Sequence, residues 1–245
     1  MANNTPLQSL RVSGSCRIPG GQYDEVHGSG SIRIEGNVTA NSFETSGSVR
    51  GQGSLKTKRF RTSGSTRVDG PVEVSDGRAS GSFRVDGSFR VLDQFVLSGS
   101  THISGAVAGE RVRGSGALAI GEEVALEELN WSGSVRCPGL ISADTIELRV
   151  HGTSAVGELA GAKIRVTVGK IGNWARWIPF AGAQLTRLTV SEVSGDDILL
   201  EATEAKAVRG DRVVIGPQCR IQRVEYRDSL EVDSDAFVAE SIKLS

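Results

Sequence analysis

Six arginines recur at one fixed place in a glycine-rich repeat and are the chain's clearest candidates for binding chemistry. Each lies three residues after the central glycine of a Ser-Gly-Ser-like tripeptide, so stacked repeats would align them in an outward column: Arg17, Arg33, Arg50, Arg67, Arg84 and Arg136. Such a column is either an anion-facing stripe for lipid, glycan or an acidic partner, or a solvated charge ladder. We favour the ladder, because Glu35, Asp69 and Asp86 follow two positions later and can alternate with the arginines.

A second candidate contact surface is an aromatic insertion in residues 169–187. It carries Trp174, Trp177 and Phe180 beside basic residues, and it interrupts the repeat instead of continuing it. The insertion is interpreted either as a short amphipathic element that touches a membrane or protein partner, or as a loop that covers its own fold. We favour the covering loop, because the segment is short and Pro179 limits any helix within it.

Catalytic signals are weak, and we expect no enzyme activity, metal or cofactor. His27, His102 and His151 fall at three different places in the repeat, so stacking does not gather them. The three cysteines have no metal-ligand spacing, and Cys16 and Cys137 occupy positions that hold apolar residues elsewhere. A hexapeptide-like stretch near Val213 resembles solenoid acyltransferases, but it occurs once. No phosphate-binding Gly-Lys-Ser/Thr loop is present.

The elements that position these residues follow from the repeat itself. Its central glycines recur at an interval of about 17 residues, and they are Gly14, Gly30, Gly47, Gly64, Gly81, Gly99, Gly116, Gly133 and Gly152. Three short apolar segments per repeat alternate with polar residues, which is the pattern of half-buried strands. The sequence therefore predicts an all-β parallel solenoid, a triangular β-helix of about 17 residues per turn, with Phe60 and Phe95 in its interior.

This period divides the chain into four segments. Residues 1–9 are expected to form a short tail, 10–168 regular turns, 169–187 the aromatic insertion, and 188–245 less regular turns of the same solenoid. A parallel β-helix leaves backbone groups and apolar side chains open at its ends, which favours pairing with a second copy. The residues expected at these polymerisation ends are Leu10, Val12, Phe237, Val238, Ile242 and Leu244.

Composition limits the partners. The net charge is −1, far from the basic surface of a nucleic-acid binder, so no nucleic acid is expected. No signal peptide or long apolar run is apparent, which predicts a soluble cytoplasmic protein, with membrane association through the insertion as the open alternative.

The repeats Ser29-Gly-Ser-Ile-Arg-Ile-Glu-Gly and Ser80-Gly-Ser-Phe-Arg-Val-Asp-Gly resemble those of the bactofilins, bacterial cytoskeletal proteins. The stretch from Val208 through Tyr226 is similar to the longer Gram-positive members of that family. The resemblance implies a single-stranded, right-handed triangular β-helix that joins end to end into filaments without nucleotide. It also implies a scaffold in cell shape, envelope or appendage assembly. The alternative is a non-polymerising module that recruits a membrane or protein partner through the insertion or the arginine column.

Overall fold

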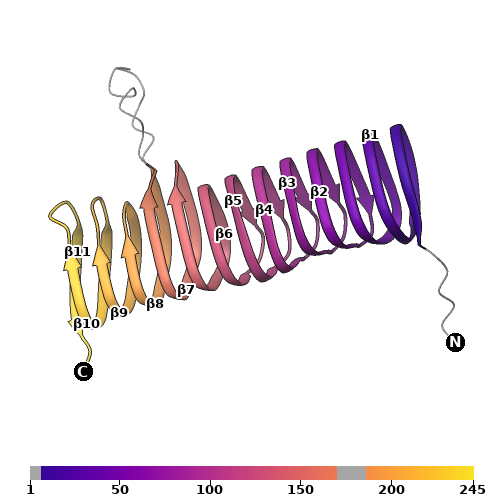
Figure 1. Ribbon diagram of the computed structural model, residues 1–245. Coiled ribbons are helices and arrows are strands. Elements are labelled where there is room, and N and C mark those ends of the chain that lie inside the picture. Colours follow the sequence, from indigo (N-terminus) through magenta and orange to yellow (C-terminus); the bar gives the residue numbers. More distant parts are fainter. Residues whose placement is uncertain (1–6, 170–185) are drawn as a thin grey trace, which may run out of the picture. The chain divides into compact units, whose positions relative to one another are not determined.

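The computed structural model describes residues 7–169 and 186–245, and these residues form strands without any helix (Figure 1). The all-β prediction is therefore confirmed. Neighbouring strands are parallel, and their order in the sheet is their order in the sequence. The strands are β1 (Gln8–Gln52), β2 (Leu55–Val68), β3 (Val72–Val85), β4 (Phe89–Ile103), β5 (Val107–Ile120), β6 (Val124–Val150), β7 (Thr153–Val168), β8 (Arg187–Leu200), β9 (Thr203–Ile215), β10 (Arg220–Val232) and β11 (Phe237–Lys243).

The chain divides into two compact units, Met1–Arg113 and Gly114–Ser245. In the first unit, Val38 pairs with Leu55 and Leu55 with Val72, which is an offset of 17 in residue number from one turn to the next. In the second unit, Asp197 pairs with Arg212, an offset of 15. One repeat of the sequence therefore corresponds to one turn of the solenoid in the first unit. The turn is shorter between β8 and β9.

One turn of the first unit shows how the interior is built. Along β2 the buried residues come in three pairs, separated by exposed positions: Leu55 with Thr57, Phe60 with Thr62, and Thr66 with Val68. A single residue separates the two members of each pair, and its side chain is less buried than theirs. This is expected where alternate side chains of a strand face the same side. Three inward pairs per turn make the triangular cross-section that the sequence predicts.

The interior of the first unit contains a stack of phenylalanine rings. Phe60 lies 5.7 Å from Phe43 and 5.8 Å from Phe95, measured between ring centroids. Phe83 and Phe89 complete the cluster, and the rings of Phe89 and Phe95 meet edge to face at 5.0 Å. Because these residues come from successive turns, the cluster ties the turns together through side chains as well as backbone hydrogen bonds.

The repeated glycine is required by close backbone approach at one corner of the turn. Gly64 has a φ of +115°, and a Cβ added there would lie 2.3 Å from the Gly47 carbonyl oxygen. Gly47 stands in the same relation to Gly30. A side chain at this corner meets both an unfavourable backbone conformation and the neighbouring turn, so glycine recurs for steric reasons.

Candidate functional site: the edges of the terminal turns

The last strand, β11, forms one edge of the second unit's sheet. It pairs with β10 on one side and has no partner strand on the other among the described residues. Val238 aligns with the buried Ile221, and Ser241 aligns with the buried Val224. Val238 is only half-buried, however, and Ser241 is exposed. The inward side of this turn is therefore partly open to solvent.

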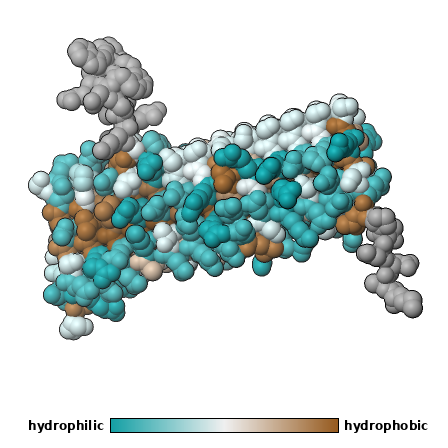
Figure 2. Space-filling model, in the orientation of Figure 1, coloured by the Kyte–Doolittle hydropathy of each residue, from teal (hydrophilic) through white to brown (hydrophobic). Residues whose placement is uncertain are grey.

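Hydrophobic surface gathers near the same edge. Phe237 is 63% exposed and Val232 is 46% exposed, and Figure 2 shows brown, hydrophobic surface over the turns of β9 to β11. Phe237 aligns with Arg220, which aligns with Glu204, so Phe237 continues a column of exposed residues instead of entering the interior. Ile242 and Leu244 are half-buried. Val238 is thus the apolar residue that extends the inward column of Ile221.

The first described turn of the other unit is open in the same way. Leu10 and Val12 are half-buried. A Cβ added at Gly14 would have no atom within 4 Å, whereas one at Gly30 would lie 2.5 Å from the Gly14 carbonyl oxygen. Within this unit, Gly30, Gly47, Gly64, Gly81 and Gly99 each lie against the preceding turn at this corner, but Gly14 has no described neighbour on that side.

Part of the arginine column is stacked, and three of its six arginines form ion pairs with carboxylates among the described residues. Arg50 aligns with Arg67 and Arg67 with Arg84, while His102 takes the next place. Arg67 forms ion pairs with Asp69 at 2.7 Å and Asp86 at 2.6 Å. The column also contains the pairs Arg84 with Asp86 and Arg17 with Glu35, and Arg136 aligns with Ala155 in the second unit. These contacts are those of a charge ladder, the interpretation favoured above.

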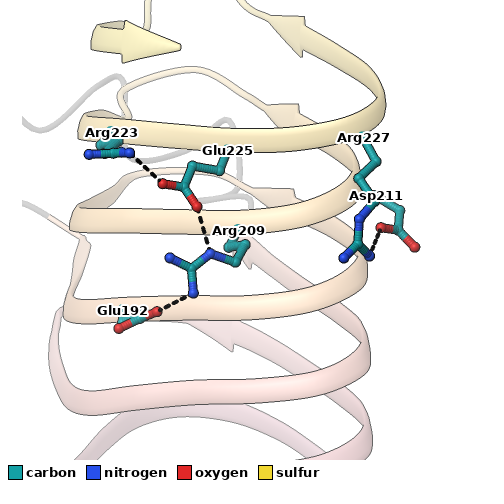
Figure 3. Close-up of polar contacts among 6 residues, drawn as sticks. All are labelled: Glu192, Arg209, Asp211, Arg223, Glu225 and Arg227. Atoms are coloured by element: carbon teal, nitrogen blue, oxygen red, sulfur yellow. Dashed lines mark hydrogen bonds and ion pairs between the residues drawn. The ribbon is translucent and has the colours of Figure 1, made fainter. Parts of the chain in front are cut away.

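A second ion-pair ladder joins β8, β9 and β10 (Figure 3). Arg209 of β9 lies 3.7 Å from Glu192 of β8 and 2.6 Å from Glu225 of β10, and Glu225 also meets Arg223 at 2.7 Å. Asp211 meets Arg227 at 3.0 Å. The hydrogen bond from Arg209 lowers the pKa of the Glu225 carboxyl and raises the pKa of the arginine.

The same strands hold a parallel set of contacts around Arg212. Its guanidinium donates to Asp197 of β8 and lies 3.6 Å from Asp228 of β10. The hydrogen bond from Arg212 lowers the pKa of Asp197. The repeat pattern alone does not predict this ladder, but opposite charges spaced by close to one turn are a signal for it in the sequence: Asp197, Arg212 and Asp228.

These carboxylates give the second unit an acid-sensitive contribution to stability. Since their folded pKa values lie below the unfolded ones, the contribution is present above the unfolded pKa and is lost as pH falls through the folded pKa. We expect the melting temperature to fall as pH is lowered from about 5 to about 3, and Arg209→Gln to make that fall shallower. Thermal melts followed by circular dichroism across this range test the expectation; an unchanged pH dependence in the variant contradicts it.

The remaining chemistry-bearing residues lie apart. Cys137 and Cys219 are buried and Cys16 is half-buried, and all three are free thiols. Burial raises the pKa of the Cys219 thiol to about 11 and also raises the pKa of Cys137. Raised pKa values keep both thiols protonated near neutral pH, which suits core packing. His151 contacts Ser132 at 3.4 Å, while His27 lies between Glu25 and Glu44.

The aromatic residues Trp174, Trp177 and Phe180 lie outside the described residues. Within residues 7–169 and 186–245, no group of three or more His, Cys, Asp or Glu side chains is placed to hold a metal ion. None of the described residues belongs to an apolar helix of membrane-spanning length.

Comparison with known proteins finds two relatives in Bacillus subtilis (strain 168). The chain is 35% identical to the uncharacterized protein YhbF over 107 residues, which is 43% of this chain and 42% of YhbF. It is 36% identical to the uncharacterized protein YhbE over 108 residues, 43% of this chain and 44% of YhbE. The match thus spans less than half the length of either relative. No family model and no solved structure matches the chain.

Proposed function

We propose that the protein is a bactofilin-like scaffold that assembles end to end into filaments without nucleotide, and that it catalyses no reaction. The observation that carries the proposal is the open state of both terminal turns. β11 offers an unpartnered edge among the described residues, with Val238 half-buried beside it, and the first described turn leaves Gly14 uncovered.

The physical argument rests on edge strands. An unpaired strand edge presents a row of N–H and C=O groups that accept a further parallel or antiparallel strand. In the interior of the first unit, β2 and β3 each pair with a parallel strand of the preceding turn and of the following turn. A second copy stacked on a terminal turn continues this arrangement and buries the side chains that are half-exposed there, Val238 at one edge and Val12 at the other. Val232, which aligns with the buried Ile215 but is itself 46% exposed, is a further apolar side chain that such a copy would cover.

The resemblance of the repeats to bactofilins supports the cellular setting of the proposal. A filament of this kind would act in bacterial cytoplasm as a passive scaffold for cell shape, envelope or appendage assembly. Its partners would be further copies of the chain and the envelope or appendage proteins that it organises.

Placing a charge at one terminal turn is expected to stop assembly while leaving the fold intact. Val238→Arg puts a guanidinium on the inward column at the β11 edge, where a stacked copy would bury it without a partner. We expect filaments to be replaced by dimers or monomers in electron microscopy and light scattering. Ala239→Arg is the matched control, because Ala239 is the exposed neighbour on the same strand.

Val12→Arg with Ser13→Arg as its control makes the same test at the other end, since Val12 is half-buried and Ser13 exposed. Circular dichroism of each variant reports whether the β-fold is retained. Filaments that persist in both Val12→Arg and Val238→Arg contradict end-to-end assembly. A wild-type chain that stays monomeric favours the non-polymerising docking module instead.

A further inference from the structure

A long open groove runs over successive turns of the first unit, beside the glycine corner. The volume of the groove is about 1020 Å³. One serine from each turn lines it, immediately before the repeated glycine: Ser13, Ser29, Ser46, Ser63, Ser80 and Ser98. The parallel register stacks the last four of these directly, and Figure 2 shows a pale band of near-neutral hydropathy along the turns of β1 to β4. We call this feature the serine-lined groove.

The hydroxyls of the serine-lined groove are available to a ligand. Five of its six serines are exposed and Ser98 is half-buried. No hydrogen bond of their side chains is formed with any described residue. Because adjacent parallel strands are about 4.8 Å apart, the groove presents a hydroxyl at each such step. A ligand that uses several of them must be extended and repetitive.

A second row in the same groove supplies positive charge. Two residues before each of the first five serines stand Arg11, His27, Glu44, Arg61 and Arg78, and all of them line the groove. Glu44 is the one carboxylate of the row, and it is shared between His27 at 3.7 Å and Arg61 at 4.0 Å. Arg11 and Arg78 form no ion pair with the described residues. The row therefore keeps a net positive charge that its own contacts do not neutralise.

The serine-lined groove differs from the arginine column in how its arginines are paired. Arg67 and Arg84 in that column are held by Asp69 and Asp86 at 2.6 to 2.8 Å. An incoming anion would have to displace these short contacts. In the serine-lined groove, Arg78 has no such contact with the described residues and Arg61 has only the long contact to Glu44. The contrast holds for Arg67 and Arg84 against Arg61 and Arg78, since Arg33 and Arg50 of the arginine column also form no ion pair among the described residues.

We propose that the serine-lined groove binds an extended polymer of phosphate groups. Arginine guanidinium groups donate in pairs to phosphate oxygens, and serine hydroxyls donate to the same acceptors. Among the described residues no Phe, Tyr or Trp side chain lines the groove and the imidazole of His27 is its one ring, so it offers no row of stacking platforms for the bases of a single-stranded nucleic acid. The single carboxylate, Glu44, already lies 3.7 Å from His27 and 4.0 Å from Arg61. This binding site is additional to the proposed assembly and does not depend on it.

The test measures binding of inorganic polyphosphate to the intact chain by calorimetry, at low and at physiological salt. We expect binding that weakens steeply as salt rises, because polymer counterions are released on association. The double variant Arg61→Gln/Arg78→Gln is expected to weaken binding by about tenfold or more, since both lost groups make charge-assisted hydrogen bonds. Both residues are exposed, so the variant keeps the fold.

Arg67→Gln/Arg84→Gln is the matched control, because it removes the same number of charges from the self-paired column. Equal loss of affinity in the two double variants means that binding follows net charge alone, and this overturns the proposal. Polyglutamate and single-stranded DNA of similar charge are the comparison polymers. Tighter binding of either than of polyphosphate assigns the groove to an acidic peptide or a nucleic acid and also overturns it.

Discussion

Replacement of Phe95 by alanine is expected to lower the free energy of unfolding by about 3–5 kcal/mol. Phe95 is fully buried, and its ring centroid lies 5.0 to 5.8 Å from those of Phe60, Phe83 and Phe89. Truncation removes buried apolar area and leaves a cavity that rings from neighbouring turns cannot fill without moving. Chemical denaturation of the purified variant measures the loss. Phe60→Ala is expected to behave in the same way, because Phe60 is equally buried.

Leu92→Ala serves as the control for this prediction. Leu92 lies in the same strand, β4, but is 44% exposed, so its truncation is expected to cost no more than about 0.5 kcal/mol. A loss as small as that of Leu92→Ala at both Phe95 and Phe60 would mean that the inward register is not the one described.

The glycine corner gives a second large effect. Gly64→Ala is expected to destabilise the fold by about 3 kcal/mol or more, because alanine at positive φ is strained and its Cβ would also lie 2.3 Å from the Gly47 carbonyl oxygen. Gly14→Ala shares the positive φ but meets nothing within 4 Å. We expect it to cost only about 1 kcal/mol, from backbone strain alone. Chemical denaturation measures the free energy of unfolding of both variants. Equal losses would contradict a role for the close approach of Gly64 to the Gly47 carbonyl oxygen.

Much of the fold is predictable because repetition amplifies a weak local signal. One strand of alternating residues is ambiguous, but the same alternation at Leu55, Val72 and Phe89, each one turn from the last, is typical of stacked turns. The departures are local. Between Val74 and Asp76 of β3 the register shifts, which accommodates the longer repeat of β4 as a bulge. The residue types around Val74 and Asp76 do not by themselves predict the position of that bulge.

The candidate site is less predictable, because it depends on single-residue register. Neighbouring residues of a strand face opposite sides, so the apolar pair Phe237 and Val238 divides between the outer surface and the inward column. The sequence analysis grouped both at the polymerisation end. Likewise, the spacing predicts Asp69 and Asp86 beside Arg67, but it does not show that Arg78 forms no ion pair with the described residues, which depends on the stacked register.

The most direct test of end-to-end assembly is electron microscopy of the purified wild-type chain without nucleotide, together with light scattering over a range of concentrations. We expect filaments that lengthen with concentration and form without added nucleotide, because open terminal turns add copies at both edges. Particles of constant monomeric mass at high concentration and low salt would contradict the account.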